Sequence, residues 1–113
     1  IAADPLAAAR DAAGRLQAVV VLKGAETVVV TPDGQAWLNA EGDLGLGTAG
    51  SGDVLSGVMA GFLARGAAPA TAAIWAVWTH GEAGRRLSAR YGGPGYLARE
   101  IAGELPAILA ELA

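Results

Sequence analysis

Blocks of apolar residues along this chain predict a short series of strands followed by helices. Residues 18–22 form a continuous apolar, β-branched run without alternation, which predicts a strand covered on both faces, as in a parallel sheet. Residues 27–30 and 35–39 flank the turn Pro32-Asp33-Gly34 and predict a hairpin. The strand region therefore runs from about residue 18 to residue 39.

Helical spacing of apolar residues governs the rest of the chain. Asp4 followed by Pro5 predicts a capped helix that ends near Gly14, ahead of the first strand. After the hairpin, three helices are expected over residues 54 to about 64 (closed by Gly66), 69 to about 89 and 96–105, with Pro106 starting a short final helix. The pattern as a whole predicts an α/β fold with the helices after the sheet.

A stretch of small residues, Gly45 to Gly57, lies where the first long helix begins. Small residues let a backbone approach a ligand, and the first-turn N–H groups of a helix have no intrahelical partner. Together with the helix dipole they favour bound phosphate or a developing negative charge. We therefore predict an anion hole at Gly50, Ser51 and Gly52, with Asp53 as an acid in the first turn.

Two other interpretations of this stretch are possible. Ser51 or Thr48 could be a simple helix cap, with Asp53 complementing the helix dipole. Residues 45–50 also match the G-x-G-x-x-G pattern of dinucleotide-binding folds. That motif must follow a buried strand directly and precede an acid by about 20 residues, whereas a polar loop comes before it here and residues 66–70 hold no acid.

Lys23 and Gly24 directly follow the predicted strand at residues 18–22. Ligands of open α/β sheets collect at the carboxyl ends of strands, so this pair suggests a contact to a nucleotide phosphate or ribose. Thr27 could donate a hydrogen bond nearby. A plain polar turn explains the position equally well.

Composition and charge exclude several function classes. The chain has 113 residues, 53% of them hydrophobic, and a net charge of −3, which indicates one small packed domain. Its eight Lys and Arg residues form no basic stripe, so nucleic acid is not an expected partner. It has no cysteine and no apolar run of membrane-spanning length, so no disulfide, membrane span or thiolate metal site is expected, and the predicted location is the cytoplasm.

Three aromatic or basic side chains have ordinary structural explanations. His80 is the only histidine and has no neighbouring histidine or cysteine, so a role in helix packing is favoured over metal ligation. Trp75 and Trp78 are spaced to pack as a pair. No metal-binding residue can be assigned from the sequence.

The start of the chain suggests that it is part of a longer domain. It opens without an initiator Met, in what reads as a helix already in progress. The predicted strand at residues 18–22 also needs neighbours on both sides, and this sequence provides one. We expect the missing strands to lie upstream, or to come from a partner chain.

Three blocks together resemble one known family: Lys23-Gly24-Ala25-Glu26-Thr27, Pro32-Asp33-Gly34, and residues 48–57. They are similar, in order and spacing, to the C-terminal half of the ADP/ATP-dependent NAD(P)H-hydrate dehydratases of the ribokinase-like superfamily. The family's usual block Gly-Met-Ala-Thr-Gly-Gly-Thr-Gly-Asp is changed here to Leu46, Gly47, Ala49 and Ser51 at four positions. These replacements keep the residues small or apolar, and Ser51 keeps a hydroxyl.

The resemblance implies the C-terminal portion of a three-layer α/β/α domain over residues 1–113, with its N-terminal half missing. It implies dehydration of hydrated NADH or NADPH (NADHX or NADPHX), with ADP or ATP consumed and Mg²⁺ accompanying the nucleotide. Asp53 would contact the hydrate and act on its hydroxyl. The residues expected to contact the nucleotide are Lys23, Gly24, Ala25, Glu26, Thr27 and Gly52.

Two rival functions remain at this stage. A ribokinase-like kinase for a small molecule would use the same anion hole and the same acid. A non-catalytic nucleotide-binding fragment could instead pair its open sheet edge with another chain. A homo-oligomer is also possible, and catalysis is expected to need the missing half.

Overall fold

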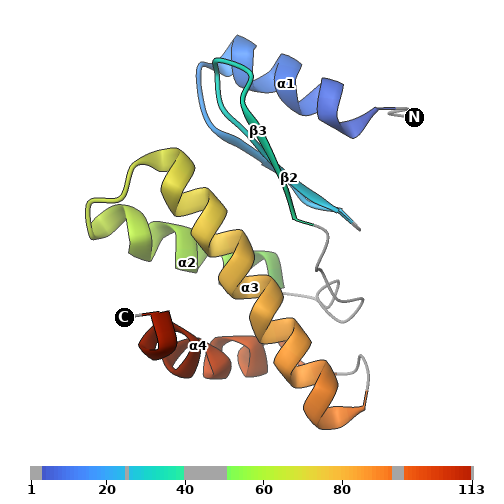
Figure 1. Cartoon of the computed structure of the whole chain (residues 1–113), viewed down its shortest axis with the longest axis vertical. Coiled ribbons are helices and arrows are strands. Elements are labelled where there is room, and N and C mark those ends of the chain that lie inside the picture. Colours follow the sequence, from blue (N-terminus) through green and yellow to red (C-terminus); the bar gives the residue numbers. More distant parts are fainter. Residues whose placement is uncertain (1–3, 25, 40–50, 93–95, 113) are drawn as a thin grey trace.

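The computed structural model describes residues 4–24, 26–39, 51–92 and 96–112 and has a mixed α/β fold (Figure 1). The elements, in chain order, are α1 (Pro5–Leu16), β1 (Val20–Leu22), β2 (Thr27–Val30), β3 (Ala36–Asn39), α2 (Ser51–Ala64), α3 (Pro69–Tyr91) and α4 (Ala98–Leu112). The predicted fold class is confirmed, including the three strands and the helices that follow them. Of the described helices, none combines the length and the apolar character that a membrane crossing requires.

The three strands form an antiparallel meander in the order β1-β2-β3. Val20 pairs with Val30, and Val30 pairs in turn with Ala36, so the hairpin predicted over residues 27–39 is confirmed. The parallel neighbour predicted for residues 18–22 is not found in the described chain, where β1 pairs only with β2 and its valines are half-buried. The four residues between β1 and β2 are too few for a parallel crossover, which takes a dozen or more.

Successive side chains of β2 point to opposite faces of the sheet and contribute to two separate apolar layers. Val28 and Val30 pack against Ala9 and Ala13 of α1 on one face of the sheet. Val29 faces the opposite layer, where α2 and α3 contribute most of the buried side chains. Because successive strand residues point to opposite faces, the single run of valines in β2 holds helices on both sides.

Helix α1 begins as predicted and ends later than predicted. The carboxylate of Asp4 accepts a hydrogen bond from the backbone N–H of Ala7 at 3.1 Å, and Pro5 occupies the first turn. The helix continues past Gly14 to Leu16, because Gln17 adopts the left-handed conformation and donates its backbone N–H to Ala13. The end expected near Gly14 is therefore wrong by two residues.

Helix α4 is one continuous helix, so the predicted break at Pro106 is wrong. Ile101 and Ile108 lie on either side of the proline and are both fully buried in a cluster with Leu87 of α3. Burial of this face across the proline outweighs the loss of one backbone hydrogen bond. Tertiary packing thus overrides the local helix-breaking signal.

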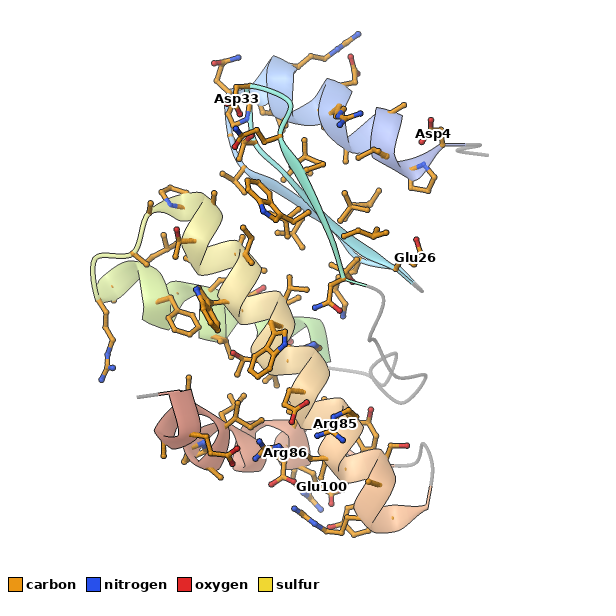
Figure 2. The ribbon with its side chains drawn as sticks, in the orientation of Figure 1. Asp4, Glu26, Asp33, Arg85, Arg86 and Glu100 are labelled. Carbon is orange, nitrogen blue, oxygen red and sulfur yellow. The ribbon has the colours of Figure 1, made fainter. Side chains whose placement is uncertain are left out.

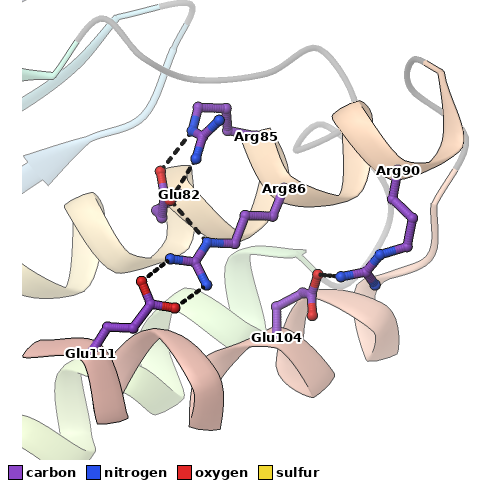
Figure 3. Close-up of polar contacts among 6 residues, drawn as sticks. All are labelled: Glu82, Arg85, Arg86, Arg90, Glu104 and Glu111. Carbon is purple, nitrogen blue, oxygen red and sulfur yellow. Dashed lines mark hydrogen bonds and ion pairs between the residues drawn. The ribbon is translucent and has the colours of Figure 1, made fainter.

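Ion pairs fasten α3 to α4 along one side (Figure 3). The Glu82 carboxylate accepts hydrogen bonds from Arg85 at 2.7 Å and Arg86 at 2.9 Å, both on its own helix. Arg86 also binds Glu111 of α4 through two bonds of 2.8 Å. The bidentate geometry fixes how α4 lies along α3.

Candidate functional site

The predicted anion site lies at the start of α2. The helix begins at Ser51, with Gly52 and Asp53 in its first turn, and both of these residues are exposed. First-turn N–H groups lack partners within a helix and carry the positive end of its dipole. Gly50, Thr48 and the rest of the preceding loop lie outside the described residues, so the structure places only the helical part of the predicted anion hole.

The ammonium group of Lys23 reaches this helix start. Its Nζ atom lies 4.0 Å from the position that a Cβ atom would take on Gly52. Lys23 directly follows β1, whereas Gly52 belongs to α2, so the two motifs that the sequence analysis singled out meet in space. A cation and a helix N-terminus facing one another are well suited to bind a phosphate.

The rest of the Lys23–Thr27 segment forms a tight connection between β1 and β2. A Cβ atom on Gly24 would lie 3.3 Å from the Glu26 backbone oxygen, so glycine is favoured there by the close approach of the backbone. Glu26 is exposed at the end of the sheet where β1 gives way to β2 (Figure 2), and Thr27 pairs with Asn39 in the hairpin. Ala25 lies outside the described residues.

Asp53 follows Gly52 directly in the sequence and lies in the first turn of α2. Its exposure leaves the carboxylate open to a ligand that approaches the start of α2. The described residues contain no cluster of three or more acidic, histidine or cysteine side chains that could hold a metal by themselves. A magnesium–nucleotide complex needs only one or two protein carboxylates beside the phosphates, which Asp53 fits.

His80 and the pair Trp75 and Trp78 all lie on α3, where they contact other side chains or are buried. His80 is only 3% exposed within α3, and Trp75 and Trp78 contact edge to face with ring centroids 6.1 Å apart. The predicted packing of Trp75 on Trp78 is confirmed, and His80 is buried as a packing role requires.

An apolar groove of about 1040 Å³ was missed by the sequence analysis. It runs between α2 and α4, with Trp75 of α3 contributing to its wall. The apolar periodicity indicates α2 as one helix, whereas Pro106 has the pattern of a break between residues 96–105 and the segment that follows. The signal that could have revealed the groove is the series Ala102, Pro106 and Ala110, which are small residues at four-residue spacing on α4.

Comparison with known proteins gives consistent matches. Residues 1–107 match the family described as NAD(P)H-hydrate dehydratase. An ADP-dependent (S)-NAD(P)H-hydrate dehydratase of Xanthomonas campestris is 50% identical over 100 residues, which cover 88% of this chain and 35% of that protein. A bifunctional NAD(P)H-hydrate repair enzyme of Moorella thermoacetica is 41% identical over 109 residues, which cover 96% of this chain and 21% of that protein.

A solved structure matches the fold closely. The ADP/ATP-dependent NAD(P)H-hydrate dehydratase of Bacillus subtilis, co-crystallised with ATP and Mg²⁺, superposes with a TM-score of 0.88 and 34% sequence identity. The match covers 96% of this chain and 39% of that one. This chain therefore spans about a third of the length of the Xanthomonas relative and somewhat more of the Bacillus structure.

Proposed function

Because this chain belongs to the NAD(P)H-hydrate dehydratase family, we propose that the domain containing it dehydrates NADHX or NADPHX to NADH or NADPH and consumes ADP or ATP. The observation that carries the proposal is the approach of Lys23 to the start of α2 beside Asp53. Lys23 follows β1, whereas Gly52 and Asp53 open α2, so separate elements bring a cation to an exposed helix start that carries an acid. Their chemistry matches a terminal phosphate and the hydroxyl that receives it.

The proposed reaction has two steps. The hydroxyl oxygen of the hydrate attacks the terminal phosphorus of the nucleotide while Asp53 takes the hydroxyl proton, and the bond from that phosphorus to the rest of the nucleotide breaks. The C–O bond of the resulting phosphate ester then breaks, so that inorganic phosphate leaves with the former hydroxyl oxygen, and loss of a proton from the neighbouring carbon forms the double bond. Phosphorylation thus turns a poor leaving group into a good one.

The residues of this chain mainly bind and neutralise the phosphates. The first-turn N–H groups of α2 and the Lys23 ammonium stabilise the charge on the transferring phosphoryl group. Mg²⁺ bound with the nucleotide would supply further positive charge beside the phosphates. Glu26 and Thr27 are proposed to contact the nucleotide at the connection between β1 and β2.

The direct test measures the return of NADH absorbance from NADHX after addition of ADP and Mg²⁺. The assay uses the 113-residue chain alone and the same chain co-expressed with the remainder of the Xanthomonas relative. We expect turnover only with the remainder present, because the hydrate needs walls that the described elements do not form. Failure of the complemented pair to produce NADH, despite tight ADP binding, would contradict the proposed function.

A small-molecule kinase is the second candidate, since the same anion site and acid would serve it. The two functions differ in their phosphorus-containing product. A dehydratase releases inorganic phosphate with each NADH formed, whereas a kinase accumulates a stable phosphorylated acceptor. Phosphorus NMR of the reaction mixture separates them. The cytoplasmic location and the oligomeric state stay predictions.

A further inference from the structure

Two glycines in the interior of α2 have no packing explanation among the described residues. Gly57 and Gly61 lie one turn apart, and a Cβ atom added to either would have no described atom within 4 Å beyond the helix's own nearby backbone. Glycine is unfavourable inside a helix compared with alanine. A glycine at such a position is useful where another backbone approaches closely, and the described chain provides no such backbone.

Both glycines line the apolar groove between α2 and α4. Across from them, α4 presents the small residues Ala102, Pro106 and Ala110. Trp75 and Leu109 also line the groove and leave 44% and 40% of their surfaces exposed. The groove therefore combines a small-residue floor with large apolar side chains that water still reaches.

We propose that this groove binds a helix from the remainder of the dehydratase domain, packed closely against Gly57 and Gly61. The proposal rests on family membership and on the larger domain included in the proposed function. It does not depend on the chemistry assigned to Asp53. It adds a defined contact surface to that larger domain.

The length of the relatives supports this occupant. The chain covers 35% of the Xanthomonas protein and 39% of the Bacillus structure, so each carries much more chain than the matched part. The described sheet leaves one edge of β1 and one edge of β3 unpaired, and α2 starts beside Lys23, the residue that follows β1.

The lining defines what the bound helix must look like. The groove extends along about three turns of α2, from Val54 to Arg65, which is room for a helix of similar length. Arg65 is the only charged residue among the described lining residues. The helix should therefore carry a small apolar face, with an acidic residue near Arg65.

The test co-expresses the tagged 113-residue chain with the remainder of the Xanthomonas relative and measures co-purification. We expect the two to co-purify, and we expect Gly61→Leu to reduce the captured amount at least tenfold. Gly103→Leu is the matched control, because Gly103 lies on α4 outside the groove lining and is likewise uncrowded. It should leave capture unchanged.

A milder variant separates loss of binding from misfolding. Gly61→Ala should raise the melting temperature of the 113-residue chain alone, since the added methyl meets no described atom, and should still weaken capture. Absence of capture, or equal capture of the Gly61 and Gly103 variants, would overturn the proposal. The proposal would also be overturned if the chain forms a dimer that dissociates on Gly61→Leu, because the groove would then bind a second copy of the chain. Capture without NADH formation would contradict the proposed function and leave this inference intact.

Discussion

The Lys23 ammonium nitrogen lies 4.0 Å from where a Cβ atom would stand on Gly52, although a turn, a hairpin and a long connection separate the two residues in the chain. This contact unites the Lys-Gly block that follows β1 with the Ser-Gly-Asp block that opens α2. The space between them has a positive side chain on one side and a helix N-terminus on the other. Three predictions concern this site directly.

Lys23→Met should weaken ADP binding about tenfold or more, because a charge-assisted contact to phosphate contributes about 1.5–3 kcal/mol. Isothermal titration of ADP with Mg²⁺ measures the change. Arg15→Gln is the control, since Arg15 is an exposed cation on α1 that pairs only with Asp11 among the described residues. If Lys23→Met and the parent bind ADP with equal affinity, Lys23 does not contact the nucleotide.

Gly52→Ala should lower nucleotide affinity without destabilising the fold. The added methyl would stand in ordinary contact with the Lys23 ammonium and fill part of the proposed phosphate space. Thermal melts with and without ADP separate the effect on fold stability from the effect on ADP binding. The melting temperature without ligand should equal that of the parent, and the increase caused by ADP should be smaller than in the parent. A full ADP-induced increase would show that the phosphate binds elsewhere. Gly103→Ala serves as the control for adding a methyl to a helical glycine.

Asp53→Asn should lower the rate of NADH formation at least a hundredfold while leaving ADP affinity within about twofold, because the amide cannot take up the hydroxyl proton. The comparison uses the complemented enzyme and steady-state rates. Asp11→Asn, which changes an exposed acid on α1, should leave the rate unchanged. A non-catalytic binding module would show the same behaviour for both variants.

Glu82→Gln should destabilise the fold by about 1–3 kcal/mol, because it weakens charged hydrogen bonds to Arg85 and Arg86. Those bonds, from Arg85 first and Arg86 next, lower the pKa of Glu82 from 4.5 to about 2. A lowered pKa gives stability that is complete above the unfolded value and is lost as the pH falls from about 4.5 towards 2.

Urea unfolding at pH 7 and at pH 3 checks this prediction. The difference in the free energy of unfolding between the parent and Glu82→Gln should be larger at pH 7 than at pH 3. Asp11→Asn breaks an exposed pair and should change the unfolding free energy by less than about 1 kcal/mol. A difference that stays constant over this range would mean that Glu82 does not titrate in the predicted window.

Pro106→Ala should stabilise the fold by about 1–2 kcal/mol. It restores the backbone donor that proline lacks inside α4, with part of the gain offset by a more flexible unfolded chain. Pro69→Ala is the matched control, because Pro69 starts α3, where a missing N–H costs nothing. Chemical unfolding should therefore give changes in the free energy of unfolding that are opposite in sign for the two variants, or clearly different in magnitude.

The sequence was most informative where local chemistry and tertiary packing agree. Asp4 and Pro5 fixed the start of α1, Gly66 followed the end of α2 with a φ of +94°, and the hairpin turn at Asp33 formed as predicted. At each of these positions the residue itself restricts the backbone. The convergence of Lys23 and Gly52 was predictable only through the family resemblance, since neither residue's local pattern contains the other.

The errors arose where distant contacts decide the outcome. Pro106 has the pattern of a helix break, yet the buried face shared by Ile101 and Ile108 keeps α4 continuous. The valines of β1 have the pattern of a parallel strand, and the described chain pairs only one edge of β1, antiparallel with β2, so a parallel neighbour on the other edge stays a prediction. The apolar groove depends on the relative placement of three helices, which periodicity within one helix cannot specify.

Many of the contacts in this fold join elements that are neighbours along the chain. α1 packs on β1 and β2, the strands pair with their neighbours in the chain, and α3 packs on α2 and α4. Short-range contacts of this kind form rapidly, so the meander and the helical part can each begin to fold as a local unit. Lys23 belongs to the first unit and Gly52 to the second. A nucleotide phosphate held between them would act as a ligand that joins two folding units, and its binding energy would add directly to the cooperativity of the domain.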